Sequence, residues 1–128
     1  MMVRTFTRNT SGTSAVEFAM TAPLFVALLL AVIEGGLMLW TQLGIQYGTE
    51  NAARCASINA TVCGTASDIQ NYAAGQAFGL KLPPAIFSVS APACGNQVTA
   101  VYEFGFISNY VMGKPVTLSA QACYPKAS

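Results

Sequence analysis

The sequence predicts an α+β fold with a long N-terminal hydrophobic helix, a short second helix and a small three-stranded antiparallel sheet. Three observations lead to this prediction. Uncharged residues run from Phe18 to Ile33, and the apolar character resumes from Leu37 to Trp40. A capping pattern for a second helix lies near residue 65. Finally, three runs of alternating apolar and polar residues occupy the C-terminal third of the chain.

The composition is unusual for a protein surrounded by water. The 128 residues are 53% hydrophobic and only 9% charged, which is too little charge for the surface of an ordinary soluble domain. The net charge of +1 comes without a basic stripe or an acidic block, so we expect no nucleic-acid partner. Histidine is absent, which removes the usual catalytic triads and the commonest metal ligand. We therefore expect no enzyme activity, no cofactor and no metal site.

The hydrophobic helix is long enough to cross a membrane. Residues 18–40 would span about 35 Å, against a hydrocarbon core of about 30 Å. Arg4 and Arg8 precede this segment and no basic residue follows before Arg54, so the positive-inside tendency predicts a cytoplasmic N-terminus. A cleaved secretory signal is the alternative. The apolar stretch is longer than a usual signal core and begins beside an acidic residue, which favours a retained helix.

An amphipathic pattern extends the helix beyond the membrane segment to about residue 60. We therefore expect three parts. Residues 1–12 form a short cytoplasmic leader, and residues 13–60 form the long helix with its transmembrane segment at about 18–40. Residues 61–128 form a small α+β domain on the other side of the membrane.

The residues directly before the apolar segment carry a specific motif. The run Gly12-Thr13-Ser14-Ala15-Val16-Glu17-Phe18 resembles the prepilin cleavage site of the tight-adherence branch of type IV pilins. Such sites have glycine, four further residues, then glutamate and an aromatic residue. The segments at residues 22–24, 33–40 and 51–54 add to a resemblance to the TadE-like family over residues from about 12 to 60.

The resemblance implies a minor pilin or pseudopilin of a tight-adherence type IV pilus that assists pilus assembly and surface adhesion. Its leader would be cut after Gly12, which leaves Thr13 as the new N-terminus. The implied partners are the inner membrane, a prepilin peptidase, other pilin subunits and the pilus assembly platform. The implied location is the bacterial inner membrane with a periplasmic C-terminal domain, and incorporation into an extracellular pilus. The alternative is a single-pass, inner-membrane anchored interaction module that is not assembled into a pilus.

Glu17 and Phe18 are the residues that we expect to act in assembly and docking. Cleavage after Gly12 would create an α-amino group on Thr13, about one helical turn from the Glu17 carboxylate. A carboxylate near hydrocarbon costs a few kcal/mol unless it is paired, so Glu17 would gain by docking beside the ammonium group of a neighbouring subunit. The alternative is an interfacial charge near a helix N-terminus, which the helix dipole favours without any partner.

Three further positions on the helix are candidates for contact with a partner. Glu34 should lie just inside the outer interface of the membrane, where it either bonds a neighbouring helix or extends to the headgroups. Gly44 and Gly48 have the spacing of small residues that lets another helix approach closely. We assign these two glycines to subunit contact, and expect the small residues that follow them to pack under the protein's own sheet.

The C-terminal part should begin with a second helix over residues 66–78, because Thr65 and Asp68 have the spacing of a capping box. Pro83-Pro84 then ends any helical pattern. Strands are expected at residues 86–91, 98–106 and 116–124, joined as an antiparallel meander.

The four cysteines contain no C-x-x-C pair, which favours structural disulfides over a zinc or redox site. Three pairings are possible. In a meander the first strand ends where the third strand ends, so Cys94 can approach Cys123. This leaves Cys55 to pair with Cys63, which would tie the end of the long helix to the loop after it.

Overall fold

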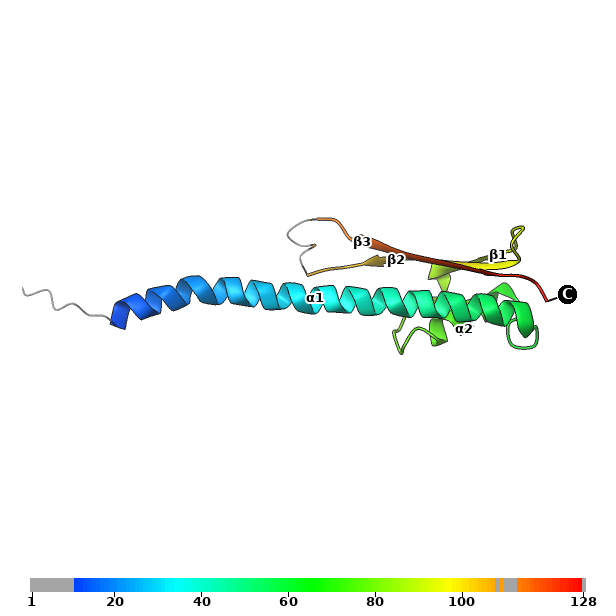
Figure 1. The fold of residues 1–128 in the computed structure, drawn as a ribbon, viewed down its shortest axis with the longest axis horizontal. Helices are drawn as coiled ribbons and strands as arrows, with labels where there is room; N and C mark the ends of the chain where they lie inside the picture. The colour runs from blue at the N-terminus through cyan, green and yellow to red at the C-terminus, as the bar shows by residue number, and fades with distance from the viewer. Residues whose placement is uncertain (1–10, 108, 110–112, 128) are drawn as a thin grey trace, which may run out of the picture. The chain divides into compact units, whose positions relative to one another are not determined.

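The computed structural model describes residues 11–107, 109 and 113–127. Residues 1–10 of the expected leader lie outside this range. The elements drawn in Figure 1 have the expected α+β composition and order. They are α1 (Ser11–Ile58), α2 (Ala66–Gly75), the 3-10 turn η1 (Pro84–Ile86), β1 (Phe87–Ser90), β2 (Asn96–Phe104) and β3 (Val116–Tyr124).

The chain divides into two compact units, Met1–Gly35 and Gly36–Ser128. In the first unit the described residues are those of α1 alone. The second unit contains the remainder of α1 together with α2, η1 and the sheet. The folded domain thus includes the C-terminal part of α1, whereas the sequence analysis placed the boundary of the domain after residue 60.

Within the second unit, one face of α1 is buried and forms one side of the hydrophobic core. Buried residues recur every three or four positions along it, which is the spacing of one helix face. Two of them are threonines, and their hydroxyls donate to the carbonyls of Leu37 and Ile45 at 2.8 and 2.7 Å, so both buried hydroxyls are satisfied. The face consists of Thr41, Gly44, Ile45, Gly48, Thr49, Ala52, Ala53 and Cys55.

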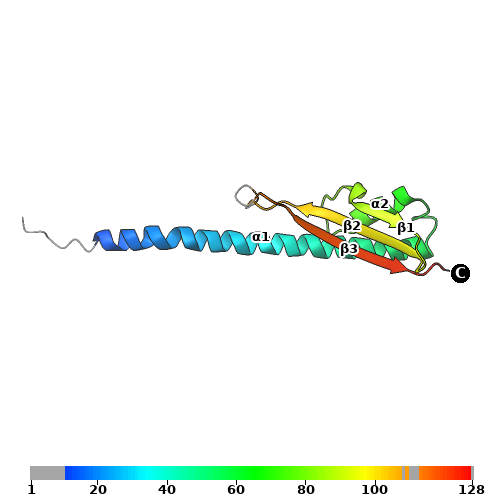
Figure 2. The same ribbon diagram turned by 90° about the horizontal axis from the view of Figure 1, so that it is seen from above.

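The sheet is the expected antiparallel meander, in the order β1-β2-β3, and Figure 2 shows its strands along the C-terminal part of α1. β2 is central, and its Ala100 pairs with Phe87 of β1 and with Ala120 of β3. Phe87, Val98 and Ala100 are fully buried. Alternate residues of the strands therefore lie on one face of the sheet, as the sequence predicted, and this face packs toward the helix.

Hydrogen bonds from side-chain amides connect the helices with the sheet. Gln42 on α1 donates to the carbonyl of Ser119 on β3 at 2.8 Å. Gln70 on α2 donates to the carbonyl of Phe87 on β1 at 2.7 Å. Asn96 donates to the carbonyl of Ala56 at 3.0 Å, which anchors the start of β2 two residues before the position that periodicity indicated. Each of these bonds satisfies a backbone carbonyl at the edge of a small core.

α2 begins as the sequence predicted and ends earlier. The Thr65 hydroxyl accepts a hydrogen bond from the Asp68 backbone N–H, and the Asp68 carboxylate accepts one from the Thr65 N–H, which completes a capping box. The helix stops at Gly75 rather than near residue 78. Phe78 and Gly79 then have φ angles of 49° and 73°, in the left-handed region, and these angles turn the chain out of the helix.

Both expected disulfides are present. Cys55 is bonded to Cys63 and Cys94 to Cys123, with Cα–Cα distances of 5.8 and 6.3 Å. The first bridge is buried, since Cys55 is 7% and Cys63 3% exposed. The second closes the open end of the meander, where Cys94 is exposed and Cys123 half-buried. Bridges of this kind contribute about 2–4 kcal/mol each, which matters for a core of this size.

The assignment of Gly44 and Gly48 to subunit contact is corrected by the structure. Both are buried inside the second unit. A Cβ on Gly44 would lie 2.7 Å from the Leu80 side chain, and one on Gly48 would lie 2.6 Å from the Ala73 carbonyl oxygen. The close approach that these glycines permit is therefore that of α2 and its following loop in the same chain.

Gly48→Ala tests this packing. We expect it to lower the free energy of unfolding by about 1–3 kcal/mol, because the new methyl group meets backbone that cannot rotate away. Chemical denaturation of the full chain in detergent micelles, followed by Trp40 fluorescence, would measure the change. Gly36→Ala is the matched control, because a Cβ there meets nothing within 4 Å. Unchanged stability combined with lost self-association would restore the subunit-contact assignment.

The unequal burial of the bridges predicts the order of their reduction. Under native conditions a mild thiol reductant should open Cys94–Cys123 well before Cys55–Cys63, because a thiolate must reach a sulfur atom to attack it. Alkylation of freed thiols followed by peptide mass mapping would identify the first bridge to open. In denaturant the two bridges should open together. Earlier loss of Cys55–Cys63 in the native protein would contradict the burial described here.

Candidate functional site

The N-terminal part of α1 presents apolar side chains outward. The large apolar residues of the first unit are between 44% and 76% exposed. So large an exposed apolar surface marks contact with a membrane or with protein. α1 is also long and apolar enough to cross a membrane. The exposed large apolar residues of the first unit are Val16, Phe18, Met20, Leu24, Phe25, Val26, Leu28, Leu29, Leu30, Val32 and Ile33.

Pro23 and Thr21 both affect the hydrogen bonding within this segment of α1. α1 continues through Pro23, which has no N–H to donate to the carbonyl of Ala19. Two residues earlier, the Thr21 hydroxyl donates back to the carbonyl of Glu17 at 2.9 Å and also approaches that of Phe18 at 3.4 Å. The hydroxyl is thus satisfied inside the helix and needs no water.

Gly12 and Thr13 lie in the first turn of α1, because the helix begins at Ser11 rather than at Thr13. Both are exposed, and a Cβ on Gly12 would meet nothing within 4 Å. The N–H groups of a first helical turn have no intrahelical acceptor, and helix ends fray by one or two residues. The peptide bond between these residues is therefore accessible, and little structure opposes its extension.

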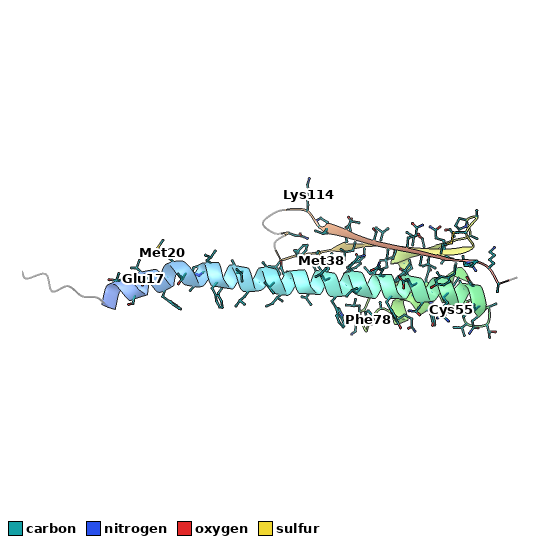
Figure 3. All side chains as sticks on the ribbon, in the orientation of Figure 1. Glu17, Met20, Met38, Cys55, Phe78 and Lys114 are labelled. Carbon is teal, nitrogen blue, oxygen red and sulfur yellow. A yellow bond between two sulfur atoms is a disulfide. The ribbon has the colours of Figure 1, made fainter. Side chains whose placement is uncertain are left out.

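Glu17 is exposed on the second turn of α1 (Figure 3). Within the described part of the chain its carboxylate makes no hydrogen bond or ion pair. The helix dipole is felt mainly in the first turn, which here contains no acidic residue, so the dipole is a weak reason for a charge at this position. The carboxylate thus stands at the edge of the apolar surface, available to a cation.

A shallow hollow of about 490 Å³ lies beside Glu17 on the same helix. It is lined by Phe18, Thr21, Ala22, Phe25 and Val26, so two small side chains lie among larger apolar ones. These positions form one face of the helix. The hollow was not predicted, although two small residues between aromatic residues seven apart could have indicated it. Such a groove can accept side chains of a second helix.

The remaining candidates offer no reacting group. Glu34 is half-buried near the end of the first unit. All four cysteines are in disulfides. Among the residues that the structure describes, no three His, Cys, Asp or Glu side chains gather to hold a metal ion. The first part of α1 therefore presents an exposed apolar surface, with the Glu17 carboxylate near its N-terminal edge.

This segment is similar to a known protein family. Residues 12–54 match a family model described as TadE-like protein, which agrees with the resemblance found in the sequence. The match begins at Gly12 and includes Glu17, Phe18 and the hollow. No curated protein and no solved structure gave a significant match. The matched residues include the part of α1 that is long and apolar enough to cross a membrane.

Proposed function

We propose that this chain, TadE-like over residues 12–54, is a minor pilin or pseudopilin of a tight-adherence type IV pilus. One observation carries the proposal. An accessible Gly12-Thr13 bond precedes an exposed apolar helix, and a carboxylate without a partner among the described residues stands four residues after Thr13. Cleavage and docking both need this arrangement.

The first step is removal of the leader by a prepilin peptidase. A peptidase binds its substrate in an extended form, and glycine at position 12 leaves that form unobstructed. The exposed first turn supports access, because few hydrogen bonds must open before the bond can be cut. Cleavage after Gly12 would leave a positively charged amino group on Thr13, about 6 Å along the helix axis from Glu17.

The second step is docking beside another subunit. The amino group on one subunit and the Glu17 carboxylate on its neighbour would neutralise each other at the edge of the hydrocarbon, where each is costly alone. The hollow between Phe18 and Phe25 would receive apolar side chains of the neighbouring helix. Contact between helices would then replace contact with lipid along the exposed surface.

The membrane orientation follows from charge and cysteine chemistry. Arg4 and Arg8 lie before the apolar segment, which favours a cytoplasmic N-terminus. The second unit would then be periplasmic, where its two disulfides can form and persist. The chain would have four partners, namely the inner membrane, the peptidase, other pilin subunits and the assembly platform. Glu34 is proposed as a further contact with a neighbouring helix.

Processing can be tested at Gly12. In cells that contain the prepilin peptidase, mass spectrometry should find a mature chain that begins at Thr13. Gly12→Val should leave a chain that begins at Met1, because a branched side chain obstructs the extended substrate. Gly35→Val is the matched control, since a Cβ on either glycine meets nothing within 4 Å. An uncut wild-type chain would favour the alternative, a membrane-anchored interaction module outside the pilus.

Docking can be tested separately at Glu17. Glu17→Gln keeps the shape of the side chain and removes its charge, so we expect normal processing and folding. Loss of the charge pair should lower the amount recovered in the sheared pilus fraction by about tenfold, equivalent to about 1.4 kcal/mol. Glu103→Gln, at an exposed position on β2, should have no such effect. Equal recovery of both variants would show that Glu17 is an ordinary interfacial charge.

A further inference from the structure

An exposed group of aromatic side chains lies within the second unit, and none of the functions above uses it. The Phe78 ring is stacked on Tyr47 at a centroid distance of 4.8 Å and is tilted against Trp40 at 5.6 Å. The three side chains are 46%, 44% and 52% exposed, in the same order. We call them, with the adjoining Leu43, the aromatic patch. Figure 3 shows Phe78 on the side of α1 away from the sheet.

The loop that carries Phe78 is held firmly against α1. Ala77 is fully buried, and the Leu80 N–H donates to its carbonyl at 3.0 Å. Gly44 lets both residues approach the helix, since a Cβ there would collide with Leu80 and crowd the Ala77 carbonyl oxygen. Between these two anchors, Phe78 points outward with its ring half exposed. The ring is therefore carried by a loop that packs against α1 on both sides of it.

The backbone at Phe78 is costly for this residue type. Its φ of 49° lies in the left-handed region, which a residue with a large side chain seldom adopts. Glycine or asparagine would adopt that conformation at lower cost, and a polar residue would suit an exposed site better. A strained backbone that displays a large apolar ring indicates a role for the ring outside the core.

The surface beside the ring is apolar and concave. A hollow of about 260 Å³ is lined by Leu43, Tyr47 and Phe78, with Gln46 and Glu50 at its polar edge. Glu50 lies three residues beyond Tyr47, about 4.5 Å farther along the axis from the apolar segment. The patch is therefore apolar toward the membrane segment of the sequence and polar at its far end.

We propose that the aromatic patch rests in the headgroup region of the bilayer on the side where the second unit lies. The inference depends on the membrane anchoring included in the proposed function. Trp40 belongs both to the patch and to the end of the apolar segment, so the patch begins where the hydrocarbon is expected to end. Tryptophan and tyrosine prefer this interface, because they combine an apolar ring with a polar group.

The length of the aromatic patch along α1 can be compared with the depth of the headgroup region. Trp40 and Tyr47 are about 10 Å apart along the helix axis, and the interfacial region is about 5–8 Å deep on each side of the bilayer. A helix tilt of about 40°, the upper end of the range seen for membrane helices, brings both positions within about 8 Å of depth. Phe78 widens the contact beyond the single helix and would seat the second unit on the membrane surface. A lipid surface accommodates this shallow apolar hollow without a shape-matched partner.

Trp40 makes the proposal directly testable, because it is the only tryptophan in the chain. The full chain would be reconstituted in phosphatidylcholine vesicles that contain nitroxide-labelled lipids, with the label either near the headgroup or near the end of the acyl chain. Trp40→Phe/Phe78→Trp moves the fluorescent reporter to the loop. Trp40→Phe/Tyr124→Trp is the control, because Tyr124 is 39% exposed on β3 and outside the patch.

Trp40 and the reporter at position 78 should both be quenched about twofold more strongly by the shallow label than by the deep label. The control reporter should be quenched by acrylamide in water and by neither lipid. The proposal is overturned if the reporter at position 78 behaves like the control while Trp40 still contacts lipid, and in that case the anchor stands. It is also overturned if that reporter is shielded from both lipid and acrylamide, which would indicate contact with a second protein chain.

The behaviour of Trp40 tests whether the apolar segment is anchored in the membrane at all. If Trp40 is quenched by neither labelled lipid, the chain does not place the end of its apolar segment in the membrane. Both the anchoring step of the proposed function and the membrane contact of the patch are then overturned. Comparing Trp40 with the reporter at position 78 thus separates the two failures.

Discussion

The folded unit depends on the close approach of α2 and its loop to α1. At Gly48 a methyl group would meet the Ala73 carbonyl oxygen at 2.6 Å, and at Gly44 it would displace the end of the Leu80 side chain and crowd the Ala77 carbonyl oxygen. This contact orients α2, and the bond from Gln70 to Phe87 then connects α2 with the first strand. The sheet follows by pairing of successive strands. Small residues on one helix face thus allow α2 and the loop after it to pack closely against α1.

A core of this size needs support beyond the burial of apolar side chains. The fully buried side chains are few, and the largest are Phe87, Ile45, Val98 and Thr49. Disulfides at the end of α1 and at the end of the meander restrict the unfolded chain, while amide side chains satisfy carbonyls at the edge of the sheet. The disulfides and amide hydrogen bonds therefore add to the stability that this small core supplies.

The two parts of α1 differ in how far their side chains are covered by the rest of the chain. In the second unit one helix face is covered by the same chain, while the aromatic patch on another face remains exposed. In the first unit the described side chains expose their apolar surface on a helix without such a cover. The exposed apolar surface of the first unit would suit contact with lipid or with other apolar helices, whereas the covered face in the second unit already packs within the chain.

The sequence by itself determined the element types, the capping box at Thr65, the meander and the motif from Gly12 to Phe18, because these depend on local periodicity and spacing. Tertiary structure decided which neighbour each helix face meets. Gly44 and Gly48 have the same spacing whether they contact a second subunit or the loop after α2, so the sequence could not separate these outcomes. It also gave no sign that Phe78 would adopt a left-handed conformation beside Tyr47, because that contact joins residues far apart in the chain and exists only once α2 has packed.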